Sequence, residues 1–156
     1  MSIPYGRQSI SAEDVQAVVE VLQSDFLTQG PAVPAFEQAV ARRCKADHAV
    51  AVNSATSALH LACLALDIGS GDRVWTSAVS FVASANCARY CDAEVDFVDI
   101  DSATGLMDMA ALEDKLQAAG RHTPKLLIPV HLAGQSCDMV TLARLATAST
   151  LSVPLA

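Results

Sequence analysis

With 156 residues, the chain is long enough for one domain with a hydrophobic core. Hydrophobic residues make up 52% of it and charged residues only 17%, which is typical of an α/β protein whose strands are buried on both faces. The net charge of −7 argues against binding nucleic acid or an acidic membrane through a basic surface.

The sequence shows no targeting segment and no membrane span. Residues 1–5 lack a basic segment followed by an apolar one, and no apolar run is long enough to cross a bilayer, so we expect a cytoplasmic protein. Of the five cysteines, four fall in predicted helices among apolar neighbours, which predicts buried thiols: Cys44, Cys63, Cys87 and Cys91. Cys87 and Cys91 share a predicted helix face, but no C-x-x-C or paired-histidine spacing accompanies them, so we expect no metal site.

The first predicted element is a helix from Ser11 to about Ser24. Ser11 is suited to cap it, because Asp14 follows three residues later. Its apolar stripe, which we expect to be buried, consists of Val15, Val18, Val19 and Leu22.

A loop over residues 25–31 separates this helix from a second one. The loop mixes apolar and polar residues before a Gly-Pro breaker, and we expect Phe26 and Leu27 to pack either on the chain's own core or on a partner. The second helix has Pro34 near its first turn. Its inward face is predicted to contain Phe36, Ala39, Val40 and Cys44.

The chain is organised around a strand, a tight turn and a helix over residues 49–66. Ala49–Val52 form a short apolar run that predicts a buried strand, and Asn53-Ser54 break it into a turn. Thr56 or Ser54 is suited to cap the helix that follows, whose inward face is Leu59, Ala62, Cys63 and Leu66.

This turn has two interpretations. The unpaired N–H groups at a helix start, together with the hydroxyls of Thr56 and Ser57, would bind a phosphate. Alternatively the hydroxyls only cap the helix, as in most α/β domains. The sequence contains neither G-x-G-x-x-G nor G-K-[ST], so a dinucleotide fold and a P-loop have no support.

Strands and helices alternate through the rest of the chain. Strands are predicted at 73–76, 94–98 and 125–130, and helices at about 81–90, from Asp108 and from Asp138 through Ala146. This rhythm predicts a mostly parallel sheet covered by helices on both faces. Ligands of such sheets bind at the carboxyl ends of the strands, which here are followed by residues 53–57, 77–81 and 131–135.

Four stretches in this order resemble a known family: 26–31 (FLTQGP), 53–59 (NSATSAL), 80–86 (SFVASAN) and 129–135 (PVHLAGQ). They are similar to the pyridoxal-phosphate-dependent sugar aminotransferases of the DegT/DnrJ/EryC1/StrS group, most of all to its transaminases of the pseudaminic acid pathway. The resemblance covers residues 3 to about 146, less than half of such an enzyme. It implies a three-layer α/β/α fold, the amino-terminal part of the large domain of a fold-type I (aspartate aminotransferase-like) enzyme.

The resemblance also implies a cofactor and a set of site residues. The cofactor would be pyridoxal 5'-phosphate, with its phosphate bound by Thr56, Ser57 and the backbone at Ala55, and its ring stacked on Phe81. From the residues alone, the favoured interpretation of Phe81 is an ordinary core aromatic, and His131 is equally a hydrogen-bonded histidine at a strand end with no catalytic role. The nucleotide-sugar site would be lined by Tyr5, Asp25, Phe26, Leu27 and Thr28, and residues 131–135 would lie near it.

A reaction and partners follow from the same resemblance. Such an enzyme is a homodimer that transfers the amino group of glutamate to the C4 ketone of a UDP-linked 4-keto-6-deoxy-N-acetylhexosamine. It needs a lysine that forms a Schiff base with the cofactor and an acidic residue paired with the pyridine nitrogen. None of Lys45, Lys115 and Lys125 matches that lysine, so we expect the 156-residue chain to be inactive alone.

The last ten residues break the α/β rhythm. Residues 147–156 show no strand or helix pattern, so we expect a partial large domain over 1–146 and an aberrant tail, as a frameshift or an early stop would produce. Two other functions remain open. One is a non-catalytic module that binds phosphate ligands or pairs with a complete homologue, and the other is a sugar dehydratase of the same family, with histidine in place of the lysine.

Overall fold

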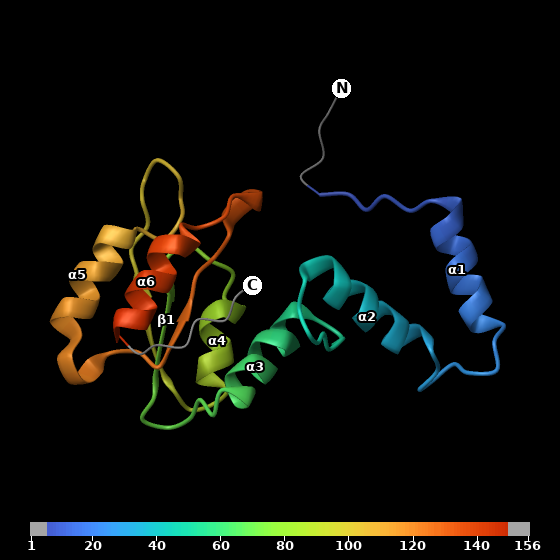
Figure 1. The fold of residues 1–156 in the computed structure, drawn as a ribbon, viewed down its shortest axis with the longest axis horizontal. Helices are drawn as coiled ribbons and strands as arrows, with labels where there is room; N and C mark the ends of the chain where they lie inside the picture. Colours follow the sequence, from blue (N-terminus) through green and yellow to red (C-terminus); the bar gives the residue numbers. More distant parts are fainter. Residues whose placement is uncertain (1–5, 150–156) are drawn as a thin grey trace. The chain divides into compact units, whose positions relative to one another are not determined.

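A computed structural model describes residues 6–149 (Figure 1). The chain divides into two compact units, one up to Ala51 and one from Val52 onward. Among the described residues, no helix has the length and apolar character needed to cross a membrane.

The first unit contains two helices that begin and end close to where the sequence predicts. Helix α1 spans Ala12–Leu22. Its cap is reciprocal, because the Asp14 N–H donates to the Ser11 hydroxyl (3.2 Å) and the Ser11 N–H donates to the Asp14 carboxylate (2.8 Å). Helix α2 spans Ala32–Cys44 and ends at Lys45, whose φ of 54° stops the helix in the left-handed region.

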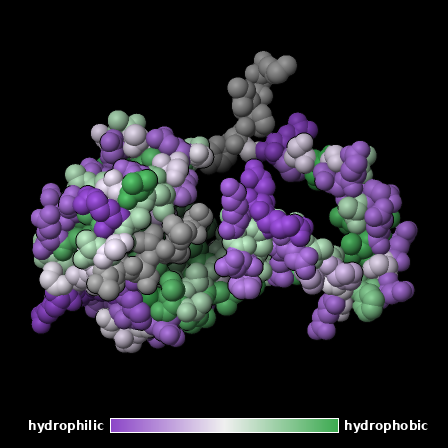
Figure 2. Space-filling view, in the orientation of Figure 1, coloured by the Kyte–Doolittle hydropathy of each residue, from purple (hydrophilic) through white to green (hydrophobic). Residues whose placement is uncertain are grey.

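The apolar faces of both helices are exposed, so the prediction of their burial is wrong. No residue of α1 or α2 is buried, and Val18 and Phe36 are each 60% exposed. Green atoms lie open along α1 at the right of Figure 2. Cys44, predicted to be buried, is exposed in the last turn of α2. The physical reason is that an apolar stripe becomes a core only against a second packed layer, and the described residues of the first unit form no such layer.

The predicted strand Ala49–Val52 is absent from the described structure. These residues have no regular secondary structure, and Val50 is 78% exposed. The Ala51 N–H donates to a carboxylate oxygen of Glu37 (2.8 Å) instead of to a neighbouring strand. An apolar run becomes a strand only where another strand pairs with it, and none does among the residues described.

The second unit is built on a parallel sheet of three strands. Strands β1 (Arg73–Ser77), β2 (Glu94–Val98) and β3 (Leu126–Ile128) lie in the order β2-β1-β3. In this register Val74 of β1 lies opposite Val95 on one side and Leu126 on the other. Strand β3 is shorter than predicted, because Pro129 has no N–H with which to continue the ladder.

Helices cover both faces of this sheet, as Figure 1 shows. Helices α3 (Ala55–Ala65) and α4 (Ala83–Arg89) cover one face, and α5 (Met109–Ala119) and α6 (Met139–Ser149) cover the other. Short 3₁₀ turns follow α5 at Gly120–His122 and β3 at Leu132–Gly134. The predicted three-layer α/β/α arrangement with a parallel sheet is therefore confirmed.

Two apolar cores lie on opposite faces of the sheet, because successive strand residues point in opposite directions. Val74 belongs to the core shared with α3 and α4, where it packs with buried Cys63 and Cys87. Trp75 belongs to the core shared with α5 and α6, where it packs with Leu112 and Leu142.

Helix α6 continues three residues beyond Ala146, where the sequence predicted its end. Its start matches the prediction, since the Asp138 carboxylate accepts the Thr141 N–H (3.0 Å). The Thr147 hydroxyl donates to the Ala143 carbonyl (2.8 Å) within the extension. Extending a formed helix through small residues costs little free energy, so 147–149 follow it without an apolar pattern. The rest of the expected tail, residues 150–156, lies outside the described residues, and the boundary at 146 stays a prediction.

Candidate functional site

The first turn of α3 is held by three side chains from the Asn-Ser-Ala-Thr-Ser run. Ser54 is the cap, because its hydroxyl accepts the Ser57 N–H (3.2 Å). The Ser57 hydroxyl donates to the Asn53 side-chain carbonyl (2.7 Å) and lies 3.1 Å from the Ser54 hydroxyl. The sequence left the cap open between Ser54 and Thr56, and it gave no signal for the role of Asn53.

These bonds leave a defined set of donors at the start of α3. The Ala58 N–H donates to the Ser54 carbonyl (3.0 Å). Within the part of the chain that the structure describes, the N–H groups of Ala55 and Thr56 and the Thr56 hydroxyl make no hydrogen bond. They lie at the positive end of an 11-residue helix, where anions are stabilised. The Ser57 hydroxyl would join them only by turning its proton away from Asn53.

Phe81 lies just before α4 and is 72% exposed. It belongs to neither apolar core, so the alternative of an ordinary core aromatic has no support in the structure. Helix α4, expected from Phe81, begins at Ala83, and the exposed ring stands on the loop that leads into it.

Phe81 and the first turn of α3 lie toward the same end of the sheet. Phe81 follows the carboxyl end of β1 after a short loop, whereas the last turn of α3 leads into the amino end of β1. Helices α3 and α4 pack side by side with the same direction, as Figure 1 shows. The predicted phosphate-binding and ring-stacking residues are thus both at the carboxyl ends of the strands, where ligands of parallel sheets bind.

The predicted nucleotide-sugar residues Asp25, Phe26, Leu27 and Thr28 belong to the first unit and are all exposed. Their loop is shaped locally, since the Ser24 hydroxyl donates to the carbonyls of Val21 (2.8 Å) and Phe26 (3.2 Å). Phe26 and Leu27 are 59% and 68% exposed in the described structure, so the alternative that they pack on the chain's own core is wrong, and packing on a partner stays a prediction. Tyr5 lies outside the described residues.

His131 ends the β3 segment and is hydrogen-bonded, as one of its two interpretations proposed. Its Nδ1 accepts the Cys137 N–H (3.1 Å), which leaves Nε2 to carry the proton of the neutral ring. The Cys137 thiol lies 3.2 Å from the Val130 carbonyl. Ala133, between them, has a φ of 53°, so the loop turns sharply back onto the end of the strand.

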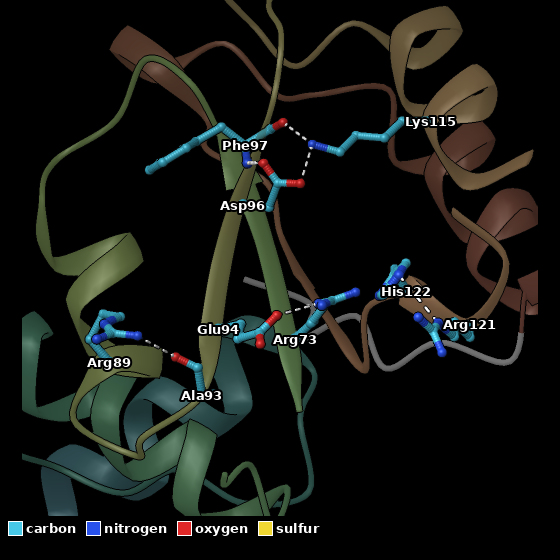
Figure 3. A network of polar contacts seen from close by, with 9 residues as sticks. All are labelled: Arg73, Arg89, Ala93, Glu94, Asp96, Phe97, Lys115, Arg121 and His122. Atoms are coloured by element: carbon cyan, nitrogen blue, oxygen red, sulfur yellow. Dashed lines mark hydrogen bonds and ion pairs between the residues drawn. The ribbon is translucent and has the colours of Figure 1, made fainter. Parts of the chain in front are cut away.

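The lysines of the second unit are engaged away from this end of α3. Lys125 donates to the Asp72 carboxylate (2.9 Å) beside the start of β3, and this hydrogen bond lowers the pKa of Asp72. Lys115, expected on an exposed helix face, instead lies over the sheet on the side of α5, 2.8 Å from the Asp96 carboxylate (Figure 3). Burial raises the pKa of Asp96, but bonds from Lys115 and the Phe97 N–H lower it overall.

Comparison with known proteins identifies this arrangement. The model of the DegT/DnrJ/EryC1/StrS aminotransferase family matches residues 8–154. The spore coat polysaccharide biosynthesis protein SpsC of Bacillus subtilis is 44% identical over 137 residues, which are 88% of this chain and 34% of that protein. The UDP-4-amino-4-deoxy-L-arabinose–oxoglutarate aminotransferase of Shewanella sediminis is 37% identical over the same shares.

Solved structures agree with the sequence relatives. Helicobacter pylori PseC, an aminotransferase of pseudoaminic acid biosynthesis, superposes with a TM-score of 0.88 at 33% identity, covering 96% of this chain and 40% of PseC. Solved members in PLP and PMP forms indicate pyridoxal phosphate as the cofactor of the family. The chain spans about a third of the length of the relatives it matches. With the family model matched over 8–154 and a fold-type I architecture, the chain belongs to the DegT/DnrJ/EryC1/StrS aminotransferase family.

Proposed function

We propose that this chain forms the cofactor-phosphate-binding part of a nucleotide-sugar aminotransferase. The reaction would move the amino group of glutamate to the C4 ketone of a UDP-linked 4-keto-6-deoxy-N-acetylhexosamine, giving 2-oxoglutarate and an amino sugar. The observation that carries the proposal is the first turn of α3, where Ala55 and Thr56 offer unengaged donors. The name of the Shewanella relative gives a UDP-linked 4-amino sugar and oxoglutarate as the two compounds between which it transfers an amino group, which supports this substrate class.

The donors at the start of α3 and the exposed Phe81 ring suit the phosphate and the pyridine ring of pyridoxal phosphate. Two backbone N–H groups and the Thr56 hydroxyl can donate to a phosphate ester at this helix start. The helix dipole alone would stabilise the bound phosphate by about 0.3–1 kcal/mol. The exposed Phe81 ring would cover one face of the pyridine ring. When bound, the cofactor supplies an electron sink for amino transfer, while Thr56 orients its phosphate and Phe81 its ring.

The same proposal holds that the 156-residue chain does not transaminate by itself. Lys115 lies over the face of the sheet opposite α3, paired with Asp96, and Lys125 is bonded to Asp72 beside the start of β3. Lys45 ends α2 in the first unit. Without an amine beside the cofactor, the positioning groups have no nucleophile to act with.

Equilibrium dialysis of the purified chain tests the phosphate site. We expect pyridoxal phosphate to bind more tightly than pyridoxal, which lacks the phosphate. Because a hydrogen bond to a charged group contributes about 1.5–3 kcal/mol, Thr56→Val should weaken the binding by roughly tenfold or more. The matched control is Thr147→Val on α6, across the sheet from α3. Equal binding of pyridoxal and its phosphate, or an equal effect of the two variants, would contradict the proposed site.

A coupled assay for 2-oxoglutarate tests the second part of the proposal. The chain is mixed with pyridoxal phosphate, glutamate and the UDP-linked keto sugar. The amount of 2-oxoglutarate is then measured until multiple turnovers would have produced a large molar excess over the protein. We expect no release above a sample without protein. Sustained release by the chain alone would show that it contains its own catalytic amine.

A further inference from the structure

Lysines and arginines gather on one part of the second unit, although the chain as a whole is acidic. The chain has ten such residues and a net charge of −7. Four of the ten line two cavities that adjoin at Arg73 and His122: Arg73, Lys115, Arg121 and Lys125. Both cavities lie where the strands begin, whereas the first turn of α3 lies toward the carboxyl ends of the strands. The site proposed for the cofactor phosphate therefore does not account for these cations.

The larger cavity, of about 480 Å³, lies between α5 and β2, and we name it the edge cavity. Two carboxylates of β2 line it, and each already accepts from one cation (Figure 3). Glu94 accepts from Arg73 Nε (2.6 Å), and Asp96 accepts from Lys115 Nζ (2.8 Å). On the side of α5 the small side chain of Ala118 leaves the cavity open. Its volume falls within the roughly 300–1,000 Å³ that is usual for small-molecule sites.

The smaller cavity, of about 240 Å³, is lined by residues 71–73, 121–123 and Lys125, and we name it the basic cavity. Among the described residues Arg121 forms no ion pair, and its Nε donates to His122 Nε2 (3.4 Å). The neutral imidazole then carries its proton on Nδ1, which is a further donor. Figure 3 shows the Arg73 guanidinium reaching from Glu94 toward His122. No hydrogen bond within residues 6–149 uses the terminal nitrogens of Arg73 or Arg121, so both can donate to an anion.

The edge cavity is also lined by Trp75, the single tryptophan of the chain. Trp75 is 2% exposed, and Lys115 Nζ lies 4.7 Å from the centroid of its ring. Its Nε1–H is buried and finds no acceptor in the part of the chain that the structure describes. Buried donors are almost always paired, so this one indicates that an acceptor from outside these residues binds beside it.

We propose that the two cavities together bind a phosphorylated polyol, such as a sugar phosphate. The phosphate binds in the basic cavity, because the guanidinium groups of Arg73 and Arg121 match the shape and charge of its oxygens. The hydroxyls extend into the edge cavity and donate to Glu94 and Asp96, whose carboxylates would repel a second anionic group. A nucleotide fits less well, because Trp75 is covered and no other Phe, Tyr or Trp lines either cavity for a base to stack on.

The fluorescence of Trp75 reports binding directly, because the chain has no other tryptophan. The purified chain, without pyridoxal phosphate, is titrated with glucose 6-phosphate, inorganic phosphate and glucose. We expect a saturable change with glucose 6-phosphate, binding of inorganic phosphate that is weaker by roughly tenfold, and no change with glucose. Ala118→Leu, which narrows the edge cavity, should weaken the binding of glucose 6-phosphate and leave that of inorganic phosphate unchanged. The matched control is Gln117→Leu, at an exposed position of α5 that lines neither cavity.

Substitution of Arg121 tests the phosphate end of the site. Arg121→Gln should weaken the binding of both phosphate-bearing probes by roughly tenfold, because a hydrogen bond between charged groups is lost. Arg144→Gln, at an exposed arginine of α6 outside both cavities, should leave it unchanged. Thr56→Val should also leave it unchanged, which separates this site from the first turn of α3. Circular dichroism checks that each variant is folded.

The outcomes keep this site apart from the proposed function. Binding that is weakened by Arg121→Gln and not by Thr56→Val supports the proposal, whether or not the chain binds pyridoxal phosphate. Absence of a saturable change both in fluorescence and in isothermal titration calorimetry would overturn it, and so would equal effects of Arg121→Gln and Arg144→Gln. Weaker binding in Thr56→Val would place the probe at α3 instead. Equal affinities for inorganic phosphate and glucose 6-phosphate would overturn the assignment of the edge cavity to a polyol.

Discussion

At the scale of single residues, Ser54 and Thr56 have different roles in the first turn of α3. Ser54 is engaged in capping, so its loss affects the helix, whereas Thr56 is free to meet a ligand. Ser54→Ala should reduce the free energy of unfolding by about 0.5–2 kcal/mol. Ser54→Asp should keep the cap but repel a bound phosphate, so stability in urea would stay near wild type while pyridoxal phosphate binding falls.

The control for the two Ser54 variants is a substitution of Ser11, which caps α1 in the first unit. Ser11→Asp should preserve its helix cap and leave pyridoxal phosphate binding unchanged. If Ser54→Asp binds the cofactor as tightly as wild type, the negative charge does not lie near the phosphate and the assigned site is wrong.

The five thiols should differ sharply in reactivity. Cys44 is exposed, whereas Cys63, Cys87, Cys91 and Cys137 are buried. Burial, with the neighbouring Cys87, raises the pKa of Cys63 to about 12, so almost none of it is thiolate at pH 8. We expect Ellman's reagent to modify one thiol rapidly in the native chain and all five in guanidinium chloride. Cys44→Ser should remove the rapid phase, and its persistence in that variant would contradict the assigned exposure.

At the scale of elements, the sequence predicted what local chemistry decides. The structure confirms the predicted helix starts at Ser11, Asp108 and Asp138. Each depends only on a hydroxyl or carboxylate that accepts from N–H groups in the first turn of its helix. The bounds of β2 are also as predicted. The strand at 49–52 could not be decided in this way, because pairing depends on a partner strand elsewhere. Apolar spacing shows which face of α1 or α2 favours burial, but not whether anything covers it.

The candidate site divides in the same way. The run 53–57 could be read as an anion site from its hydroxyls and its place before a helix. Which hydroxyl is already hydrogen-bonded within the chain depends on the rotamers of Asn53 and Ser57, and sequence spacing does not determine these rotamers. The exposure of Phe81 likewise depends on where α4 begins, and helix starts are uncertain by one or two residues.

The loop before β1 is tied to β3 by a pH-sensitive contact. The Asp72 carboxylate accepts from Lys125 Nζ (2.9 Å) and from the Gly69 N–H (2.9 Å), and its pKa is lowered. A lowered folded-state pKa adds stability above the unfolded value near 3.9, and this stability is lost as pH falls through the folded value. Since the pair is partly exposed, we expect about 0.2–1 kcal/mol at pH 7.

Urea unfolding between pH 2 and 7 measures this contribution. Asp72→Asn should destabilise the chain at pH 7 and make no difference at the acid end. Lys125→Met should destabilise it at pH 7 and keep part of that loss at the acid end, because Lys125 Nζ also donates to the Asp67 carbonyl. Asp92→Asn, at an exposed loop carboxylate, is the matched control. A difference between Asp72→Asn and wild type that is constant over the whole range would refute the assigned linkage.

Packing of α5 on the sheet should contribute more than any surface contact. Leu112 is 0% exposed and lies in the core with Trp75 and Leu142. Leu112→Ala removes buried methyl groups and leaves a cavity, so we expect a loss of about 2–5 kcal/mol in the free energy of unfolding. Leu61→Ala, at an exposed position of α3, should cost much less. Equal losses in a urea titration would place Leu112 outside the core.

At the scale of the whole chain, the two units differ in how much burial supports them. The second unit has an apolar core on each face of its sheet, whereas no residue of α1 or α2 in the first unit is buried. Helices of 11 and 13 residues are marginal in water when no packed layer stabilises them. The stability of the molecule is therefore concentrated in the second unit.

Native-state hydrogen exchange of the purified chain measures this difference. Amides of α1 and α2 should exchange through local opening, roughly tenfold or more faster than amides of β1 and β3, which exchange only when the sheet opens. Leu112→Ala should accelerate exchange in the sheet and leave α1 unchanged, because that substitution weakens only the core of the second unit. If α1 and α2 were protected as well as β1, their exposed apolar faces would have to be covered in solution, and the molecule would unfold as one cooperative unit.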